Sequence, residues 1–308
     1  MQSRFFNHIV HDPVAGTVTK TSPLKSAKLA DEIGWFLDLP KKWHGYIPLI
    51  QEYSLQEPVH LTMNWIPHPN VGDLFVNRMM PVERWKLFFG NLETIFRNFS
   101  EYPREISKDH LEKMYIAKTM QRLSSFILHN DWARKIRQRG FYRLNGVQVM
   151  CPLYIFHKHL SDFRKLLERP LAGIIHGDLC FSNLFYDLAE DNVYMIDPRG
   201  RFGSKGIYGD QRYDLAKVRH SLSGYEHIVR DAFTIHVTDE SIDIHITLHN
   251  EHETLRKLWD QSLAEGLHEV KMIEALLYLS MLPYHREHPD RQLAMYAVAT
   301  RLLYEALD

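Results

Sequence analysis

The chain has 308 residues, of which 24% are charged and 45% hydrophobic, and its formal net charge is -1. A chain of this length can bury two cores, and so balanced a charge argues against a nucleic-acid partner. Two cysteines are too few for a disulfide framework and fit a reducing compartment. The first residues lack the apolar segment of a signal peptide, and no apolar run reaches the roughly 18–20 residues that span a bilayer. We therefore expect a cytoplasmic protein without a membrane partner, and no pattern indicates an oligomeric state.

The first part of the chain reads as a small β-rich region with one helix. Runs over 7–11 and 17–21 flank a turn at 12–16 that contains Pro and Gly, which predicts a hairpin. A helix should follow, starting near Ser22-Pro23 and ending at Pro40. Its expected apolar face comprises Ala27, Ala30, Ile33, Gly34 and Leu37.

Two more strands are expected before the chain changes character. They cover 46–50 and 59–66, and Pro67-His68-Pro69-Asn70 then breaks any regular structure. We therefore predict a boundary between an N-terminal lobe over 1–67 and a C-terminal lobe over 68–308.

The remainder is mostly helical, with β-prone runs near residue 180. Residues 81–139 show helical periodicity, and the aromatic stripe from Trp85 to Phe99 is expected to be core and not a cofactor site. The turn dipeptide Asn145-Gly146 predicts a hairpin of 140–144 with 147–150. The other expected elements are a helix over 161–167, short strands over 173–175, 184–186 and 193–196, and a helical tail over 255–307 that is broken at 283–289.

The clearest chemical signal surrounds residue 178. The chain reads Ile-His-Gly-Asp-Leu-Cys-Phe-Ser-Asn over 175–183 and Met-Ile-Asp-Pro-Arg-Gly over 195–200. Asp178 supplies a carboxylate that can orient a hydroxyl group, while Asn183 and Asp197 supply the oxygen ligands that Mg²⁺ prefers. The alternative is that these residues only cap turns, as Asn and Asp commonly do. The spacing predicts a site for phosphoryl transfer.

These residues resemble the catalytic core of aminoglycoside phosphotransferases and choline kinase-like enzymes, which are relatives of protein kinases. The likeness is carried by His176-Gly177-Asp178, Asn183 and Ile196-Asp197. It implies an α+β, protein kinase-like two-lobe fold, with a small β-rich nucleotide-binding N-terminal lobe and a larger, mostly helical C-terminal lobe for catalysis and substrate. It also implies ATP and Mg²⁺ as cofactors, Asp178 as the catalytic residue, and Asn183 and Asp197 as metal ligands.

Other segments follow in the order that the family shows. Val18-Thr19-Lys20 resembles the strand with the phosphate-binding lysine, and Glu32 is placed like the helix glutamate that pairs with it, although Asp31 is a competing partner. Met63, Asn64, Trp65 and Ile66 are similar to the hinge whose backbone meets adenine. The resemblance implies structural support from His176 and Asp214. Arg199 could contact phosphate or an acidic substrate group, or form a surface salt bridge.

The chain departs from the family pattern at two places. The glycine-rich turn over the phosphates has no counterpart in Met1 to Phe6, so either the chain begins inside that turn or other residues cover the phosphates. Pro198-Arg199-Gly200 follows Asp197 where protein kinases have Phe-Gly, and the segment from there to Asp214 is too short for a long activation loop. The second departure points away from a peptide substrate.

The expected acceptor is a small molecule with a hydroxyl group. In the helical tail, Glu274, Glu287 and Asp290 are mixed with His285, Arg286 and Arg291, which does not look like a cation pocket. We therefore favour a neutral or mildly acidic compound such as a sugar over aminoglycosides or choline. Two other classes stay open: a nucleotide-binding pseudokinase or regulatory module without turnover, and a metal-dependent phosphohydrolase, which usually needs more ligands.

Histidine is abundant, with 19 residues, and three pairs invite a zinc hypothesis. None of the pairs has the Cys partners or the His-Glu-x-x-His context of a zinc site, so solvated histidines are expected. Cys180 lies within the catalytic loop but shows no base partner, so packing is the expected role. The three pairs are His8 with His11, His157 with His159, and His285 with His288.

Overall fold

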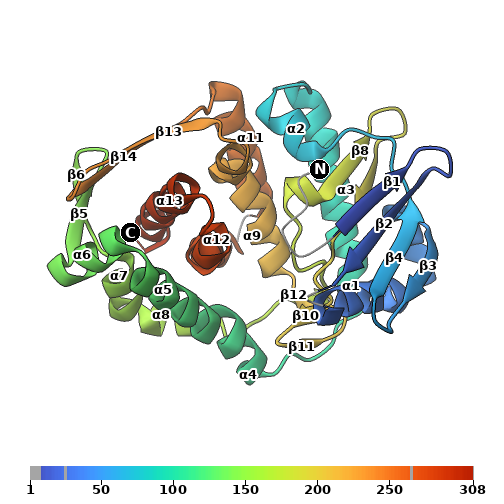
Figure 1. Cartoon of the computed structure of the whole chain (residues 1–308), viewed down its shortest axis with the longest axis horizontal. Coiled ribbons are helices and arrows are strands. Elements are labelled where there is room, and N and C mark those ends of the chain that lie inside the picture. Colours follow the sequence, from blue (N-terminus) through green and yellow to red (C-terminus); the bar gives the residue numbers. More distant parts are fainter. Residues whose placement is uncertain (1–7, 24–25, 264–265, 308) are drawn as a thin grey trace. The chain divides into compact units, whose positions relative to one another are not determined.

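The computed structural model describes residues 8–23, 26–263 and 266–307 (Figure 1). The chain forms two compact units, each built from two stretches of sequence. The first unit comprises 1–104 with 172–210, and the second comprises 105–171 with 211–308. Each unit is described by itself below, and the lobe boundary expected at residue 67 stays a prediction.

The first unit begins with a four-stranded antiparallel sheet in the order β1-β2-β4-β3. The predicted hairpin is confirmed over its described residues, since β1 pairs with β2 and Ile9 lies opposite Lys20. Lys20 in turn lies opposite Leu61, so these three side chains share one face of the sheet. The strands are β1 His8–Asp12, β2 Thr17–Ser22, β3 Ile50–Ser54 and β4 Val59–Asn64.

The predicted helix is present as α1, Ser26–Asp38, but its buried face differs from the expected one. Leu37 is 47% exposed and Ala27 is exposed, whereas the helix buries Leu29, Asp31, Glu32, Ile33, Trp35 and Phe36. The buried stripe runs through two carboxylates, and a search for apolar periodicity passes over charged residues. The buried face of α1 therefore lies at a different angle around the helix axis from the predicted apolar face.

The strand predicted over 46–50 is wrong. Lys41–Tyr46 forms the short 3-10 helix η1, and the strand β3 begins only at Ile50 and continues to Ser54. Pro48 explains the shift, because proline has no N–H group to donate to a strand ladder. The next predicted strand is confirmed as β4, and the break at 67–70 follows it.

The rest of the first unit packs on an aromatic core. The predicted helical stripe is confirmed, since α3 buries Trp85, Phe88, Phe89 and three further residues. Phe181, in the loop between Asp178 and Asn183, packs against Phe75, Trp85 and Phe88, which fixes the loop to the core. The elements are α2 Val71–Val76, α3 Val82–Ser100, β7 Ala172–Ile174, η3 Phe181–Asn183, β8 Leu184–Asp187, β9 Asn192–Met195, β10 Arg201–Phe202, β11 Ser204–Lys205 and β12 Tyr208–Asp210.

The second unit is mostly helical and carries one sheet in the order β13-β14-β5-β6. The predicted hairpin around Asn145-Gly146 is confirmed as β5 with β6. The pair β13 and β14 was not predicted, and β14 joins the hairpin in parallel to β5. The strands are β5 Phe141–Leu144, β6 Val147–Met150, β13 Phe233–Val237 and β14 Ser241–Ile246.

The helices of the second unit surround a buried ion network. Arg219 is fully buried and pairs with Asp260, Glu274 and Glu305. Glu274 is itself fully buried, so the network belongs to the core. The helices are α4 Lys108–Leu111, η2 Glu112–Ala117, α5 Lys118–His129, α6 Asp131–Arg139, α7 Pro152–Lys158, α8 Leu160–Lys165, α9 Arg212–His220, η4 Ser221–Tyr225, α10 Glu226–Val229, α11 Asn250–Leu263, α12 Leu267–Met281, η6 Leu282–His285 and α13 Pro289–Leu307.

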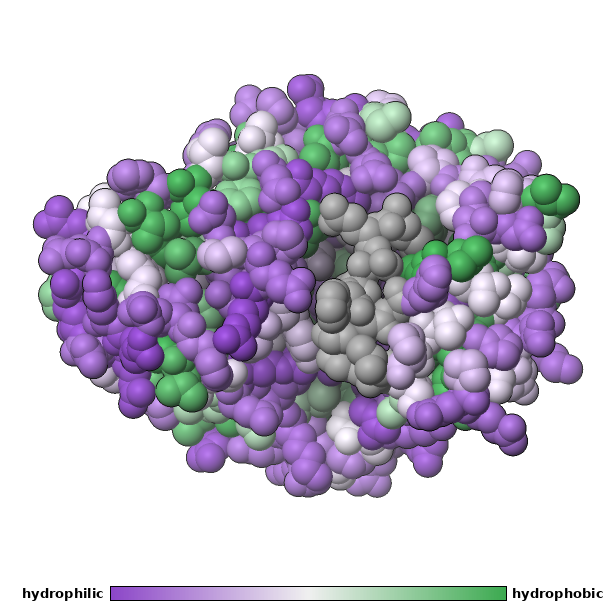
Figure 2. Space-filling model, in the orientation of Figure 1, coloured by the Kyte–Doolittle hydropathy of each residue, from purple (hydrophilic) through white to green (hydrophobic). Residues whose placement is uncertain are grey.

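The visible surface is mainly hydrophilic, with hydrophobic residues in small separate groups (Figure 2). Across 8–23, 26–263 and 266–307, no helix combines the length and the apolar character needed to cross a membrane. The predicted α+β class is confirmed, because a small antiparallel sheet is combined with a larger helical part.

Candidate active site

The structure joins the predicted lysine, glutamate and aspartate in one cluster within the first unit. Lys20 Nζ lies 2.7 Å from Glu32 Oε2 and 2.6 Å from Asp197 Oδ1. Lys20 extends from β2 and Glu32 from α1, while Asp197 lies just after β9. Glu32 is thus the partner of Lys20, whereas Asp31 binds Arg201 instead.

The charged groups in this cluster shift one another's pKa values. Burial alone would lower the pKa of Lys20, but the two carboxylates outweigh it and raise that pKa. Burial, together with nearby Asp197, raises the pKa of Glu32. Burial likewise acts to raise the pKa of Asp197, yet the ammonium group of Lys20 prevails and lowers it. Asp197 therefore stays ionised, with its side chain 41% exposed.

The loop with Asp178 and Asn183 is tied to the loop with Asp197 by three backbone-directed bonds. His176 Nε2 donates to the carbonyl of Ile196 at 2.9 Å, and the Arg199 amide donates to the carbonyl of His176 at 2.8 Å. The Ile196 amide donates to the carbonyl of Asn183 at 3.0 Å. The two predicted turns are thus held side by side.

Asp178 and Asn183 are positioned from within their own loop. The Asp178 amide donates to His176 Nδ1 at 3.2 Å, which fixes the histidine as the neutral Nε2–H tautomer. Asn183 Nδ2 donates to the carbonyl of Asp178 at 2.8 Å, so its amide oxygen points elsewhere. Asp178 is close enough for its charge to act on the pKa of Asp197.

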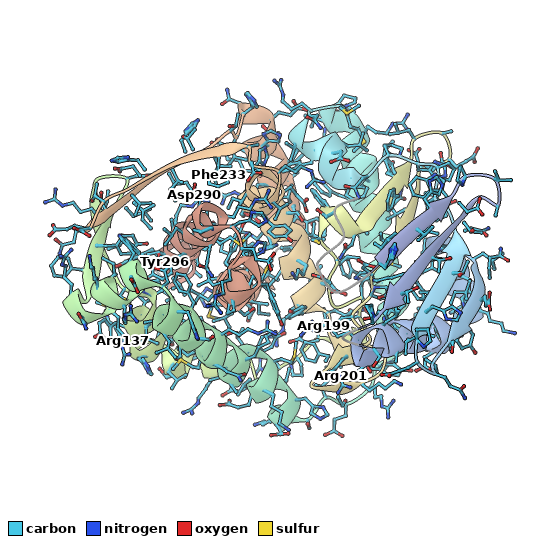
Figure 3. The ribbon with its side chains drawn as sticks, in the orientation of Figure 1. Arg137, Arg199, Arg201, Phe233, Asp290 and Tyr296 are labelled. Atoms are coloured by element: carbon cyan, nitrogen blue, oxygen red, sulfur yellow. The ribbon has the colours of Figure 1, made fainter. Side chains whose placement is uncertain are left out.

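Gly177 and Arg199 meet at the crossing of the two loops. Gly177 has φ +82°, and a Cβ there would lie 2.8 Å from Cβ of Arg199. Only glycine fits this backbone conformation and this spacing without strain. The Arg199 side chain, labelled in Figure 3, therefore covers Gly177 and is half-buried.

The predicted hinge comprises the last two residues of β4, Met63 and Asn64, and the next two, Trp65 and Ile66, in the same unit. The amides of Asn64 and Trp65 donate to the carbonyls of Leu49 and Gly16 at 2.9 Å and 2.8 Å. Met63 is buried at 7% exposure, while the Trp65 ring stacks on His11. Among the residues that the structure describes, the amide of Ile66 is the first in this segment that the sheet does not engage.

Two groups of apolar and aromatic side chains lie on the elements that carry or precede Lys20 and Asp197. On the sheet, Ile9, Val18 and Met63 share the face of Lys20, because they lie in register across β1, β2 and β4. On the hairpin before Asp197, Phe185 lies opposite Tyr194 on the partly exposed face. The sequence analysis did not single out these two aromatic residues; the signal was their alternation with the buried Tyr186 and Val193.

Asp214 lies in the second unit, on α9, and is 2% exposed. The cluster above is described within the first unit, and the supporting role of Asp214 stays a prediction. The three histidine pairs are largely exposed, as expected. Cys151 and Cys180 are both buried and free.

The donor set fits a magnesium ion. Asp197 offers an ionised, partly exposed carboxylate beside the amide of Asn183, and both are oxygen donors of the type that Mg²⁺ prefers. No group of three His, Cys, Asp or Glu side chains suited to a metal occurs within 8–23, 26–263 and 266–307. The set is thus too small for an all-protein cage and suits an ion whose other ligands are phosphate oxygens and water.

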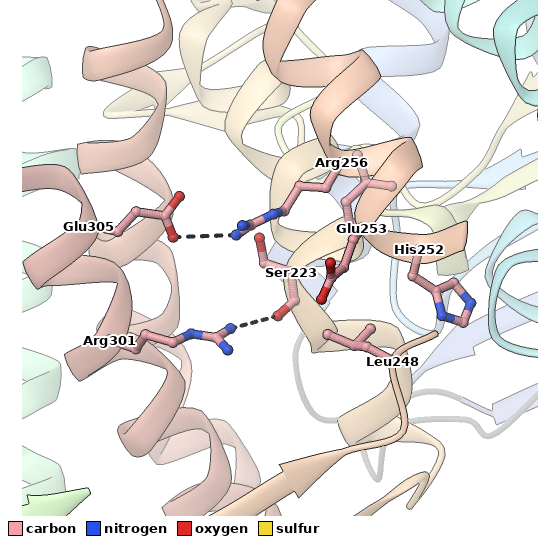
Figure 4. Close-up of a pocket in the computed structure, with 8 residues that line it drawn as sticks. Ser223, Leu248, His252, Glu253, Arg256, Arg301 and Glu305 are labelled. Atoms are coloured by element: carbon pink, nitrogen blue, oxygen red, sulfur yellow. Dashed lines mark hydrogen bonds and ion pairs between the residues drawn. The ribbon is translucent and has the colours of Figure 1, made fainter. Parts of the chain in front are cut away.

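A separate cavity of about 130 Å³ lies in the second unit (Figure 4). Arg256 pairs there with Glu305, and Arg301 donates to the carbonyl of Ser223. His252 and Glu253 of α11 line it as well. The sequence analysis gave none of these residues a functional role. The lining of the cavity balances basic and acidic groups.

A small antiparallel sheet with a buried Lys–Glu pair, followed by an Asp–Asn loop and a second Asp, defines a kinase-like fold. Solved structures agree with this class. A choline/ethanolamine kinase family protein from Mesorhizobium loti matches with a TM-score of 0.54 at 10% identity, over 98% of this chain and 86% of that chain. The choline kinase LicA from Streptococcus pneumoniae matches with a TM-score of 0.51 at 12% identity, over 99% and 92%.

Aminoglycoside phosphotransferases are similar to the same extent. The ADP-bound APH(2'')-Ib matches with a TM-score of 0.53 at 14% identity, over 98% of this chain and 90% of that chain. No family model matches the chain, and no curated protein matches it by sequence. The predicted resemblance is confirmed for the kinase-like fold that these proteins share.

Proposed function

We propose that the protein is a small-molecule kinase that transfers the γ-phosphoryl group of ATP to a hydroxyl group. The observation that carries this proposal is the convergence of Lys20, Glu32 and Asp197 next to the Asp178–Asn183 loop. Proteins of the same fold include one solved with ADP and one solved with AMP-PNP and hygromycin B. The competing reading is a nucleotide-binding pseudokinase or regulatory module without turnover.

Each residue has a part in the proposed reaction. Asp178 accepts the proton of the substrate hydroxyl and orients its oxygen, which is most of what a loose phosphoryl-transfer transition state asks of a base. Lys20, held by Glu32, neutralises phosphate charge. Asn183 and Asp197 would hold Mg²⁺, which when bound supplies further charge neutralisation. Arg199 follows Asp197 by two positions and can therefore contact a phosphate or an acidic acceptor.

We assign binding of the nucleotide base to the hinge and to the two groups of apolar and aromatic side chains described above. The free amide of Ile66 can donate to a purine, with Met63, Asn64 and Trp65 completing the hinge. Apolar and aromatic groups on both sides suit a flat base. His68 stacks on Tyr194 with 5.3 Å between ring centroids, which stiffens that side.

The proposed acceptor is a neutral or mildly acidic hydroxylated compound such as a sugar. Glu274, one of the three acidic residues considered in the tail, is fully buried and paired with Arg219. It is therefore not available to bind a cationic acceptor. Aminoglycosides and amino alcohols, which the names of the similar structures suggest, are the second choice.

Phosphoryl transfer from labelled ATP with Mg²⁺ to a panel of sugars, amino alcohols and aminoglycosides tests the proposal. We expect Asp178→Ala to lower transfer at least about 100-fold, because positioned acid–base groups contribute roughly 10²–10⁴-fold, with little change in nucleotide affinity. Asp243→Ala, at an exposed position of β14, is the matched control.

Two outcomes would contradict this account. If Asp178→Ala keeps most of its turnover, the catalytic assignment is wrong. If the chain binds ATP but transfers to no compound, the regulatory module is the better description. Phosphate release from monoesters without nucleotide would instead support the phosphohydrolase hypothesis, which the small ligand set does not favour.

A further inference from the structure

The hairpin after Asp197 lies against the helix that carries Glu32. Arg201 of β10 donates from Nε and from the guanidinium end to both carboxylate oxygens of Asp31, at 2.8 Å and 3.3 Å. Figure 3 labels Arg201 beside α1. Asp31 is 9% exposed. A two-pronged Arg–carboxylate pair with one buried partner fixes geometry better than an ordinary surface pair.

Gly200 brings the two backbones into contact at the same point. It has φ +61°, and a Cβ there would overlap the backbone carbonyl of Asp31. Any side chain at this position would push α1 away from the loop that follows Asp197. The glycine is therefore required by the close approach as well as by its φ angle.

Trp35 fixes α1 at a second point, one turn further along. Its Nε1 donates to the carbonyl of Ile175 at 2.6 Å, and its ring meets the edge of His176 with 5.7 Å between centroids. Trp35 is 1% exposed. The helix is thus bonded to the loop before Asp178 and to the loop after Asp197, both within the first unit.

We propose that Asp31, Trp35 and Arg201 are positioning residues that hold α1 where Glu32 meets Lys20. Asp31 and Glu32 are neighbours on one helix, so α1 cannot turn or slide to withdraw Glu32 without breaking the Asp31–Arg201 pair and the Trp35 bond. The Lys20–Glu32–Asp197 cluster is then preformed in the chain itself, without a modification or a partner that pushes the helix inward. The kinetic part of this inference rests on the proposed function, whereas the structural part does not.

Hydrogen exchange of the chain without nucleotide tests the structural part. Arg201→Ala should speed exchange in peptides that cover α1, residues 26–38, by about five- to tenfold, because a charged hydrogen-bonded pair is lost. Lys42→Ala is the matched control, since Lys42 forms an exposed pair with Glu101 at 2.8 Å in the same unit. Unchanged exchange across α1 in Arg201→Ala would overturn the proposal.

A pair of glycine substitutions provides a second test of the same contact. Gly200→Ala should release α1 more strongly than Arg201→Ala does. Gly34→Ala on α1 is its control, because a Cβ there would meet only the end of the Lys205 side chain, with 3.3 Å to Cε, and that end can move. Equal exchange rates across α1 in Gly200→Ala and Gly34→Ala would contradict the close approach at Gly200.

Transfer kinetics separate positioning from general support. Arg201→Ala should lower kcat about tenfold in the parent chain but cause no further loss in a Glu32→Gln background, since it acts through Glu32. An equal loss in both backgrounds would show a role independent of Glu32 and refute the positioning claim. If Glu32→Gln itself has no effect on transfer, the role proposed for Glu32 is wrong. The hydrogen-exchange result does not depend on that outcome and still tests the structural part.

Discussion

At the scale of single residues, the candidate site depends on one buried cation shared by two carboxylates. Lys20 is 5% exposed and reaches both Glu32 and Asp197. The sequence favoured Glu32 as the partner of Lys20 and kept the adjacent Asp31 as a competing partner. The structure separates them, since Glu32 points to Lys20 and Asp31 points to Arg201. The Asp31–Arg201 pair was not predicted, because its two residues are 170 positions apart and no local pattern connects them.

Replacement of the shared cation should cost stability. Lys20→Met leaves Glu32 buried beside Asp197 without a counter-charge, so we expect the free energy of unfolding to fall by about 2–4 kcal/mol. Urea unfolding measures this free energy. The control is Lys42→Met at an exposed lysine, which should change the free energy of unfolding by less than about 0.5 kcal/mol. A loss at Lys20 no larger than the loss at Lys42 would contradict the description of the cluster.

A buried histidine of the second unit should make stability depend on pH. Burial, followed by the charges of His252, Arg230 and His249, lowers the pKa of His227 to about 4. The unfolded chain takes up this proton near pH 6.5, so the contribution of His227 to folding stability should be constant above that pH and fall as the pH drops from 6.5 toward 4.

Unfolding midpoints at pH 7 and pH 4.5 measure the effect. We expect His227→Phe, which keeps a ring against His252, to lose less stability on acidification than the parent chain by about 1–3 kcal/mol. His245→Phe, at an exposed position of β14, is the control and should behave like the parent. Parallel acid profiles for His227→Phe and the parent would refute the assignment.

At the scale of elements, short apolar runs and turn residues predicted several strands in both units. The β1–β2 hairpin of the first unit and the β5–β6 hairpin of the second followed from their turns, and β8 and β9 of the first unit from their β-prone runs. The strand at 46–50 failed because Pro48 sits among residues that otherwise favour a strand. The strands β13 and β14 were missed even though apolar and polar residues alternate along both of them. The parallel pairing of β14 with the distant β5 has no local signal in the sequence.

The proposed catalytic loop, from Asp178 to Asn183, should be sensitive to the core against which it packs. Phe181 is fully buried and contacts three aromatic rings, so Phe181→Ala should lower the free energy of unfolding by about 3–5 kcal/mol. Phe181→Leu should recover much of that loss, because it leaves a smaller cavity. We expect transfer activity to follow the same order. Full activity and stability in Phe181→Ala would show that the aromatic core does not hold the loop.

At the scale of the whole molecule, the candidate site lies within one compact unit assembled from two stretches of sequence. Lys20, Glu32 and the hinge come from 1–104, while Asp178, Asn183 and Asp197 come from 172–210. The order of motifs predicted that these stretches meet, because a kinase-like fold was implied. The acceptor was not predictable in the same way. The pairing of the buried Glu274 with Arg219, which lies 55 positions away, is visible only in three dimensions.

The central claim is that Asp197 and Asn183 share one divalent cation next to Asp178. A crystal structure of the chain with a non-hydrolysable ATP analogue and Mg²⁺ tests it most directly. We expect a cation about 2.0–2.1 Å from oxygens of both Asp197 and Asn183, with the Asp178 carboxylate facing the terminal phosphate and Lys20 on the other phosphates. A nucleotide bound away from these residues, or a cation that none of them contacts, would contradict the account.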